Sequence, residues 1–182
     1  GTASNTDYIY LDTSGTKGGS GPGGYWNATA PTTTTFSVGD SAAVNGSGSD
    51  YIAYLWSDVS GFSKFGSYNG SGSNGHQITG LGFKPKFLMI KNTTSSENWV
   101  IMDSARNDQL LFANLNNAEA GSDVVDFTND GFTLNQSGSA SNASGQTYIY
   151  TAFADNLGGE GCDSLVDTPE QRTGQSDDGS GG

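Results

Sequence analysis

The stretch Phe83-Lys-Pro-Lys-Phe-Leu-Met-Ile-Lys91, followed by Asn98-Trp-Val-Ile-Met-Asp103, decides the fold of this chain. Both runs are rich in large apolar residues, and the connection Asn92–Asn98 between them is made of Asn, Thr, Ser and Glu. Two apolar runs that flank a short polar connection predict an antiparallel hairpin. A β-hairpin is therefore the first element that the sequence establishes.

Short β-rich runs continue along the rest of the chain. They are Tyr8–Leu11, Thr33–Val38, Tyr51–Trp56, Gly61–Tyr68, Leu110–Leu115, Val124–Phe127, Phe132–Leu134 and Tyr148–Ala154. Gly- and Pro-rich residues 17–24 exclude regular structure, Asn69–Gly75 predicts a loop, and Asn129-Asp130-Gly131 predicts a turn. About ten short strands with long Gly/Ser/Asn loops predict an all-β fold, an antiparallel β-sandwich or a jelly-roll-like barrel.

The composition supports this class. The chain has 182 residues, of which 28 are Gly, 14% are charged and 11% are aromatic. Long amphipathic helices need charged faces, and disordered chains are poor in aromatic residues, so both alternatives are disfavoured. We expect one β-sandwich domain over residues 1–157. Because the chain begins at Gly1 without Met, we expect it to be part of a longer product.

Residues 158–182 differ in composition and predict an acidic, Gly/Ser-rich tail or linker. Leu165 and Val166 are its large aliphatic residues, too few for a core of its own. We expect a neighbouring subunit to order this tail, with Leu165 and Val166 as assembly anchors. Removing residues 158–182 should then leave a folded domain that no longer assembles. The single cysteine, Cys162, cannot form an internal disulfide.

The charge excludes two classes of partner. The net charge is −12, and Lys and Arg together number 7. Nucleic-acid binding and attraction to an anionic membrane both need clustered basic residues. No apolar run is long enough to span a bilayer. We expect no nucleic-acid partner and no membrane insertion.

Catalytic and metal-binding patterns are weak. His76 lies in a predicted loop without a Gly-x-Ser-x-Gly nucleophile motif, and Cys162 is far from it in the sequence. No calcium loop of the form Asp-x-Asp-x-Asp-Gly occurs. Acids nominally available to a glycosidase are Asp103, Asp108, Asp123, Asp126 and Asp130, but their spacing selects no pair. We expect no enzyme activity, no cofactor and no metal.

Aromatic residues offer one candidate glycan site. Flat rings stack on sugar faces, and Tyr25 and Trp26 are the pair that we expect to be exposed. Trp56 and Trp99 fall inside apolar runs, so core packing is the expectation for both.

An internal repeat stands out from the general β pattern. Residues 45–56 (Asn-Gly-Ser-Gly-Ser-Asp-Tyr-Ile-Ala-Tyr-Leu-Trp) align without a gap on residues 142–153 (Asn-Ala-Ser-Gly-Gln-Thr-Tyr-Ile-Tyr-Thr-Ala-Phe). Phe36-Ser-Val38 matches Phe132-Thr-Leu134 at nearly the same offset. We expect two equivalent strand–loop–strand units, with the two strands of each on opposing sheets.

Several blocks in order resemble the repeated β domain of marine bacteriophage tail-fibre-like and virion structural proteins. They lie at residues 25–39, 51–68, 82–91, 98–106 and 148–154, so the resemblance covers about residues 8–157. Cys162-Asp-Ser-Leu-Val-Asp-Thr-Pro169 resembles the segment that leads into a following lectin-like domain in such proteins. The resemblance implies a virion location and a structural or adhesive role, and it supplies no catalytic residues.

We therefore expect a non-enzymatic virion structural protein that assembles with its own copies and with other virion proteins. It would be a subunit of a tail fibre or appendage, or of a capsid decoration, with loops displayed toward host-surface glycans. Two alternatives stay open. One is a stand-alone carbohydrate-binding module, and the other is an extracellular filament or surface-layer subunit of a cell.

Overall fold

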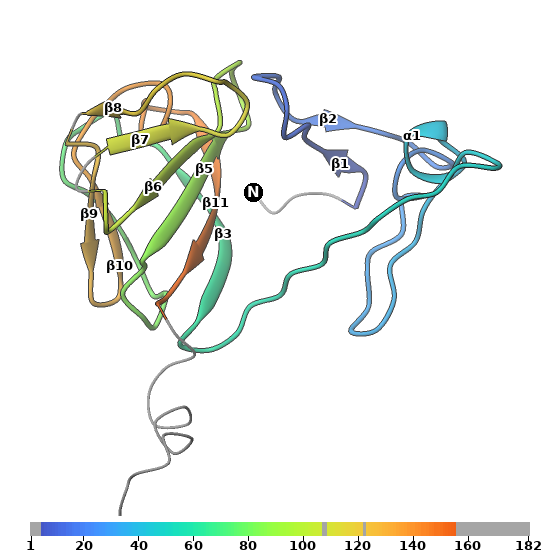
Figure 1. The fold of residues 1–182 in the computed structure, drawn as a ribbon, viewed down its shortest axis with the longest axis horizontal. Helices are drawn as coiled ribbons and strands as arrows, with labels where there is room; N and C mark the ends of the chain where they lie inside the picture. Colours follow the sequence, from blue (N-terminus) through green and yellow to red (C-terminus); the bar gives the residue numbers. More distant parts are fainter. Residues whose placement is uncertain (1–4, 107–108, 122, 156–182) are drawn as a thin grey trace, which may run out of the picture.

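The computed structural model of the protein describes residues 5–106, 109–121 and 123–155, and its regular structure is nearly all β (Figure 1). Two antiparallel sheets, of six and three strands, pack into a sandwich, and a separate two-stranded sheet lies toward the N-terminus. The predicted all-β, sandwich-like fold is confirmed. No helix in the described ranges is both long and apolar enough to span a membrane.

The six-stranded sheet is built around its long strand β11. The strand order is β3 (Ser63–Asn69), β11 (Thr147–Phe153), β5 (Phe87–Asn92), β6 (Val100–Asp103), β7 (Gln109–Phe112) and β8 (Ala120–Gly121). All neighbours are antiparallel, and β5 with β6 forms the predicted hairpin, in which Phe87 pairs with Asp103. β11 therefore has a strand on each of its edges.

The three-stranded sheet covers one face of the larger one. Its order is β4 (His76–Thr79), β10 (Gly131–Leu134) and β9 (Val125–Thr128). The turn between β9 and β10 is the predicted Asn129–Gly131, and Gly131 has a φ of 151°, where a side chain would meet the backbone of Ile78. The two predicted strands on either side of this turn are thereby confirmed.

The core lies between these two sheets. Alternate residues of β11, namely Tyr148, Tyr150 and Ala152, point inward, as side chains of a strand alternate between faces. Phe132 of β10 is fully buried and meets the Tyr150 ring edge-on, with centroids 5.4 Å apart. Aromatic and aliphatic residues from both sheets therefore share one apolar cluster.

Two buried asparagines hold the loops at one end of the sandwich. The side-chain oxygen of Asn142 accepts the amide of Ser71, and its nitrogen donates to the carbonyls of Ser73 and Gln136. Asn92 likewise donates to the carbonyl of Ser139. Both side chains are fully buried with their polar atoms bonded, as burial of an amide requires.

The N-terminal part contains little regular structure. It comprises β1 (Asp7–Tyr8), β2 (Gly18–Gly19) and the one-turn α1 (Ala42–Asn45). It contacts the sandwich through polar bonds: the indole of Trp99 donates to the carbonyl of Tyr10, and the buried ammonium of Lys91 donates to that of Ser14. Burial lowers the pKa of Lys91, while Glu97 opposes this shift.

Four local predictions are wrong. Thr33–Val38 and Tyr51–Trp56 form no β-ladder among the described residues. Gly18 and Gly19, in the segment expected to exclude regular structure, pair with β1 as β2. His76, expected in a loop, begins β4 and pairs with Leu134. A ladder depends on a partner strand, which a local pattern does not reveal.

The repeat offers a matched pair for testing the core. We expect Phe132→Ala to lower the free energy of unfolding by about 3–5 kcal/mol, because it leaves a cavity at a fully buried ring. Its counterpart Phe36 is 42% exposed, so Phe36→Ala should cost less than about 0.5 kcal/mol. Urea unfolding of both variants measures the difference. Equal costs would contradict the assigned core.

Candidate functional site

The two repeat copies build the same loop. We call residues 36–56 the first motif and residues 132–153 the second motif. In each, the tyrosine that opens the last segment closes the loop with its hydroxyl, which donates to one carbonyl and accepts one amide. The bonds are Tyr51 Oη with Ala42 O (2.6 Å) and Gly46 N (2.8 Å), and Tyr148 Oη with Ser139 O (2.9 Å) and Ala143 N (2.9 Å).

The asparagines of the two motifs also correspond. The side-chain nitrogen of Asn45 donates to the carbonyl of Gly39 at 2.8 Å, and that of Asn142 donates to Gln136 at 2.9 Å. Each residue that makes one of these bonds in the first motif has its counterpart 97 positions later in the second motif, as Asn45 has in Asn142. The expected repeat is therefore present in the loops, but the expectation of two equivalent strand–loop–strand units is wrong for residues 36–56, which form no strand. In the second motif its two strands, β10 and β11, lie on opposing sheets, as expected.

The motifs differ in what surrounds them. Tyr148 and Phe132 of the second motif are fully buried, whereas their counterparts Tyr51 and Phe36 are 45% and 42% exposed. The second motif closes the described sandwich. The first motif has the same loop but no strands against it in the described residues.

An apolar groove of about 970 Å³ lies along the first motif. Phe36, Val38, Tyr51, Ala53 and Leu55 all line it. Their counterparts in the second motif all belong to the buried core, and they are Phe132, Leu134, Tyr148, Tyr150 and Ala152. Five of the residues that line the groove therefore correspond to one side of a sandwich core, and Trp26, Ile52 and Tyr54 line it as well.

The last segment of the first motif, Tyr51–Trp56, is named here the arm. In Figure 1 it is part of the long extended connection that runs from α1 to β3. Ile52, Tyr54, Leu55 and Trp56 are each at least 67% exposed, which corrects the expectation that Trp56 is a core residue. Both faces of the arm are apolar, a pattern typical of a strand that is covered on both sides.

The aromatic pair expected to contact glycans makes contacts within the protein, and Trp26 also lines the apolar groove. The Trp26 indole donates to the carbonyl of Asp7 at 2.9 Å, and the Tyr25 ring packs edge-on against Tyr8 with centroids 4.4 Å apart. The hydroxyls of Tyr25 and Tyr10 lie 2.6 Å apart, and this hydrogen bond raises the pKa of Tyr10 to about 12. Tyr25 and Trp26 are half-buried, whereas Trp99 is buried as expected.

Of the nominal catalytic residues that the structure describes, Asp123 and Asp126 share one hydrogen-bond partner, and His76 and Asp130 serve local structure. The His76 ring packs against Tyr68, with centroids 6.1 Å apart. The Asp130 carboxylate accepts the amides of Gly80 and Gly82, at 3.0 and 2.7 Å. Asp123 and Asp126 each accept a bond from the side-chain nitrogen of Asn135, both at 2.9 Å.

Some predicted site residues lie outside the described residues. They are Asp108, Cys162, Leu165 and Val166. Within the part of the chain that is described, no three His, Cys, Asp or Glu side chains are placed to hold a metal ion.

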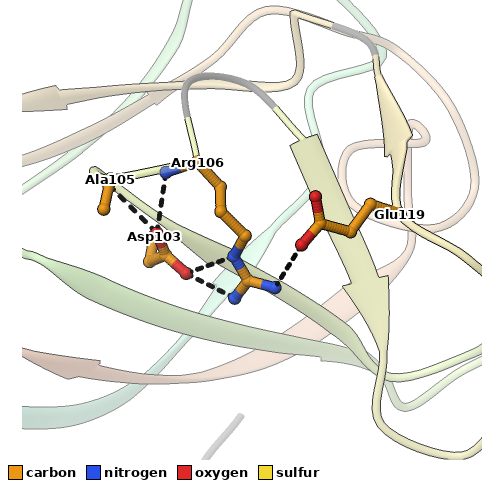
Figure 2. A network of polar contacts seen from close by, with 4 residues as sticks. All are labelled: Asp103, Ala105, Arg106 and Glu119. Atoms are coloured by element: carbon orange, nitrogen blue, oxygen red, sulfur yellow. Dashed lines mark hydrogen bonds and ion pairs between the residues drawn. The ribbon is translucent and has the colours of Figure 1, made fainter.

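A charged turn follows β6 (Figure 2). One Asp103 oxygen accepts the backbone amides of Ala105 and Arg106, both at 3.0 Å, and the other accepts the guanidinium of Arg106. The Arg106 bond holds the pKa of Asp103 below its usual range. Glu119 contacts the other side of the guanidinium at 3.4 Å. A carboxylate held in this way shapes a turn and is not available as a general acid.

We expect Asp103→Asn to lower the free energy of unfolding by about 1 kcal/mol at pH 7, since it removes the charge-assisted bond and keeps one cap oxygen. The folded-state pKa is depressed, so this stabilisation is full above the ordinary value of 3.8 and is lost as pH falls through the depressed value. Unfolding curves of both proteins between about pH 2 and pH 7 measure it. Glu119→Gln is the control, and it should lower the free energy of unfolding by less than about 0.5 kcal/mol. If the difference in unfolding free energy between the unmodified protein and Asp103→Asn stayed the same at the lowest pH, the stabilising role of the ionised Asp103 would be contradicted.

The comparisons with known proteins assign a family without a function. The model of the family described as "Domain of unknown function (DUF7483)" matches residues 1–156. Neither the curated proteins nor the solved structures contain a match to this chain. Since the family model covers most of the sequence, the chain belongs to the DUF7483 family.

Proposed function

We propose that the protein is a non-enzymatic structural subunit of a virion, placed in a tail fibre or appendage or on the capsid surface. It works by association with its own copies and with other virion proteins, and its loops face the host surface. The proposal joins the sequence resemblance to phage virion proteins with the modular structure of the chain.

The observation that carries the proposal is the repeated motif. The same loop, with the same tyrosine and asparagine bonds, occurs twice at an offset of 97 positions. Units that recur along a chain stack in one dimension and produce elongated assemblies with long exposed surfaces. A β architecture with repeated motifs suits a fibre or appendage better than it suits an enclosed catalytic site.

The location can be tested on particles. Mass spectrometry of purified virions should detect the chain at a fixed copy number relative to the major capsid protein. Gold-labelled antibody against the chain should then mark fibres, tail or capsid in electron micrographs. Labelling of a cell-surface layer, with none on particles, would support the surface-layer alternative and contradict the proposal.

Association should strengthen with salt. With a net charge of −12, copies repel one another at low ionic strength, and salt screens charges that lie more than about 10 Å apart. We expect sedimentation equilibrium to show a larger associated fraction in about 0.5 M NaCl than in about 0.02 M. Sodium sulfate should strengthen it further if the contact is apolar. A chain that stays monomeric up to about 0.1 mM in both salts would contradict self-association.

Carbohydrate binding is the second candidate function. Tyr54 and Trp56 are 73% and 67% exposed, and their rings stack at an interplanar angle of 23°. Exposed flat rings are suited to sugar faces. A glycan array with the full chain tests this, with Trp56→Ala as the comparison. Selective binding by the monomer that Trp56→Ala abolishes would favour this function over a structural role.

A further inference from the structure

The arm is the structural counterpart of β11. The hydroxyl of Tyr51 makes the two loop-closing bonds that Tyr148 makes at the start of β11, and Asn45 makes the loop bond that Asn142 makes. The loop that precedes the tyrosine is thus closed in the same way in both copies. The strands that pair with and pack against β11 therefore indicate which strands the arm needs.

β11 is paired on both of its edges. β3 pairs with it over Ser63–Asn69, and β5 pairs with it over Phe87–Asn92. Its inward residues meet the three-stranded sheet, in which β4 and β10 are neighbours. A strand of the β11 type is thus completed by β3, β4 and β5, which precede it in the chain.

In the part of the chain that the structure describes, no such strands lie against the first motif. Phe36 and Phe132 are 96 positions apart, whereas the residues from the loop onward, such as Tyr51 and Tyr148, are 97 positions apart. β3, β4 and β5 end at Asn69, Thr79 and Asn92, and either offset places their counterparts N-terminal to Gly1. Residues 5–35 provide β1 and β2, which pair only with each other. Among the described residues, no strand lies against the apolar groove beside the arm, where the opposite side of a core would be.

We propose that residues 36–56 are the closing strands of a second β-sandwich of the same kind, and that the arm pairs with β3- and β5-type strands located N-terminal to Gly1 in the same polypeptide. The occupant of the groove is then the apolar face of that segment. The arm would then make the same kind of interface that β11 already makes in this fold with β3 and β5. Successive sandwiches would be joined by the connection from the arm to β3.

The experiment restores the missing strands from the chain's own sequence. At the offset of 96, position 97 corresponds to position 1, so residues 58–96 placed directly before Gly1 reproduce the spacing and supply β3, β4 and β5. We expect amide exchange of Tyr51–Trp56 to slow by about 100-fold or more, because these amides become paired. Trp56 fluorescence should shift to shorter wavelength as the indole leaves water.

Ala53→Pro provides the matched control. Ala53 is exposed in the middle of the arm, so the substitution should leave the unextended chain unchanged. In the extended chain it removes a ladder donor from a central strand, and the protection should disappear. Arm amides that exchange equally fast with and without the added segment would overturn the proposal, as would protection that appears only when the concentration is raised.

A second measurement does not depend on folding of the extended chain. A fluorescent synthetic peptide of residues 58–96 is titrated with the unmodified full chain and with its Ala53→Pro variant. We expect saturable binding that weakens about tenfold or more in the variant. Equal binding to both would overturn the proposal. These readouts are made on the monomer, so their failure leaves the virion proposal standing, and a non-virion location leaves this inference standing.

Discussion

The sandwich depends on the burial of β11 between two strands and beneath a second sheet. Tyr148, Tyr150 and Ala152 place a continuous apolar row into the core, and pairing on both edges satisfies the backbone of the same strand. An unpaired backbone amide or carbonyl in such a position would cost about as much as a lost hydrogen bond. The central strand is therefore stable only as part of a complete set of neighbours.

The β5–β6 hairpin and the β9–β10 turn were predictable because their signals are local. Apolar runs flank a short polar connection in one case and an Asp-Gly turn in the other. β4 was not predictable in this way, because His76 and Gln77 are polar and follow a run of Gly, Ser and Asn. This segment is a strand because it pairs with β10, in which Phe132 is the partner of Ile78. The pairing partner lies more than fifty residues away, which no local pattern records.

The arm shows the opposite failure. Its sequence has all the properties of a central strand, and the pattern alone predicts one. Secondary structure of this kind is a property of two segments, and the arm has no second segment in the described residues. The polar ends of the candidate glycan pair, Trp26 and Tyr25, bond to Asp7 and Tyr10 nearby, and these contacts are not visible in the local sequence pattern. The repeat in the sequence was the signal that could have identified the groove, since it aligns the groove lining with core residues.

The two buried asparagines restrict where the chain can be made. Asn142-Ala-Ser144 and Asn92-Thr-Thr94 both have the Asn-x-Ser/Thr form that eukaryotic secretory cells glycosylate. The side-chain nitrogens that would carry the sugar donate instead to loop carbonyls inside the folded protein. A bulky glycan attached to the nascent chain would prevent either loop from closing. Recombinant production in a cytosol without that pathway leaves Asn92 and Asn142 unmodified, whereas secretion from yeast or animal cells exposes both to glycosylation.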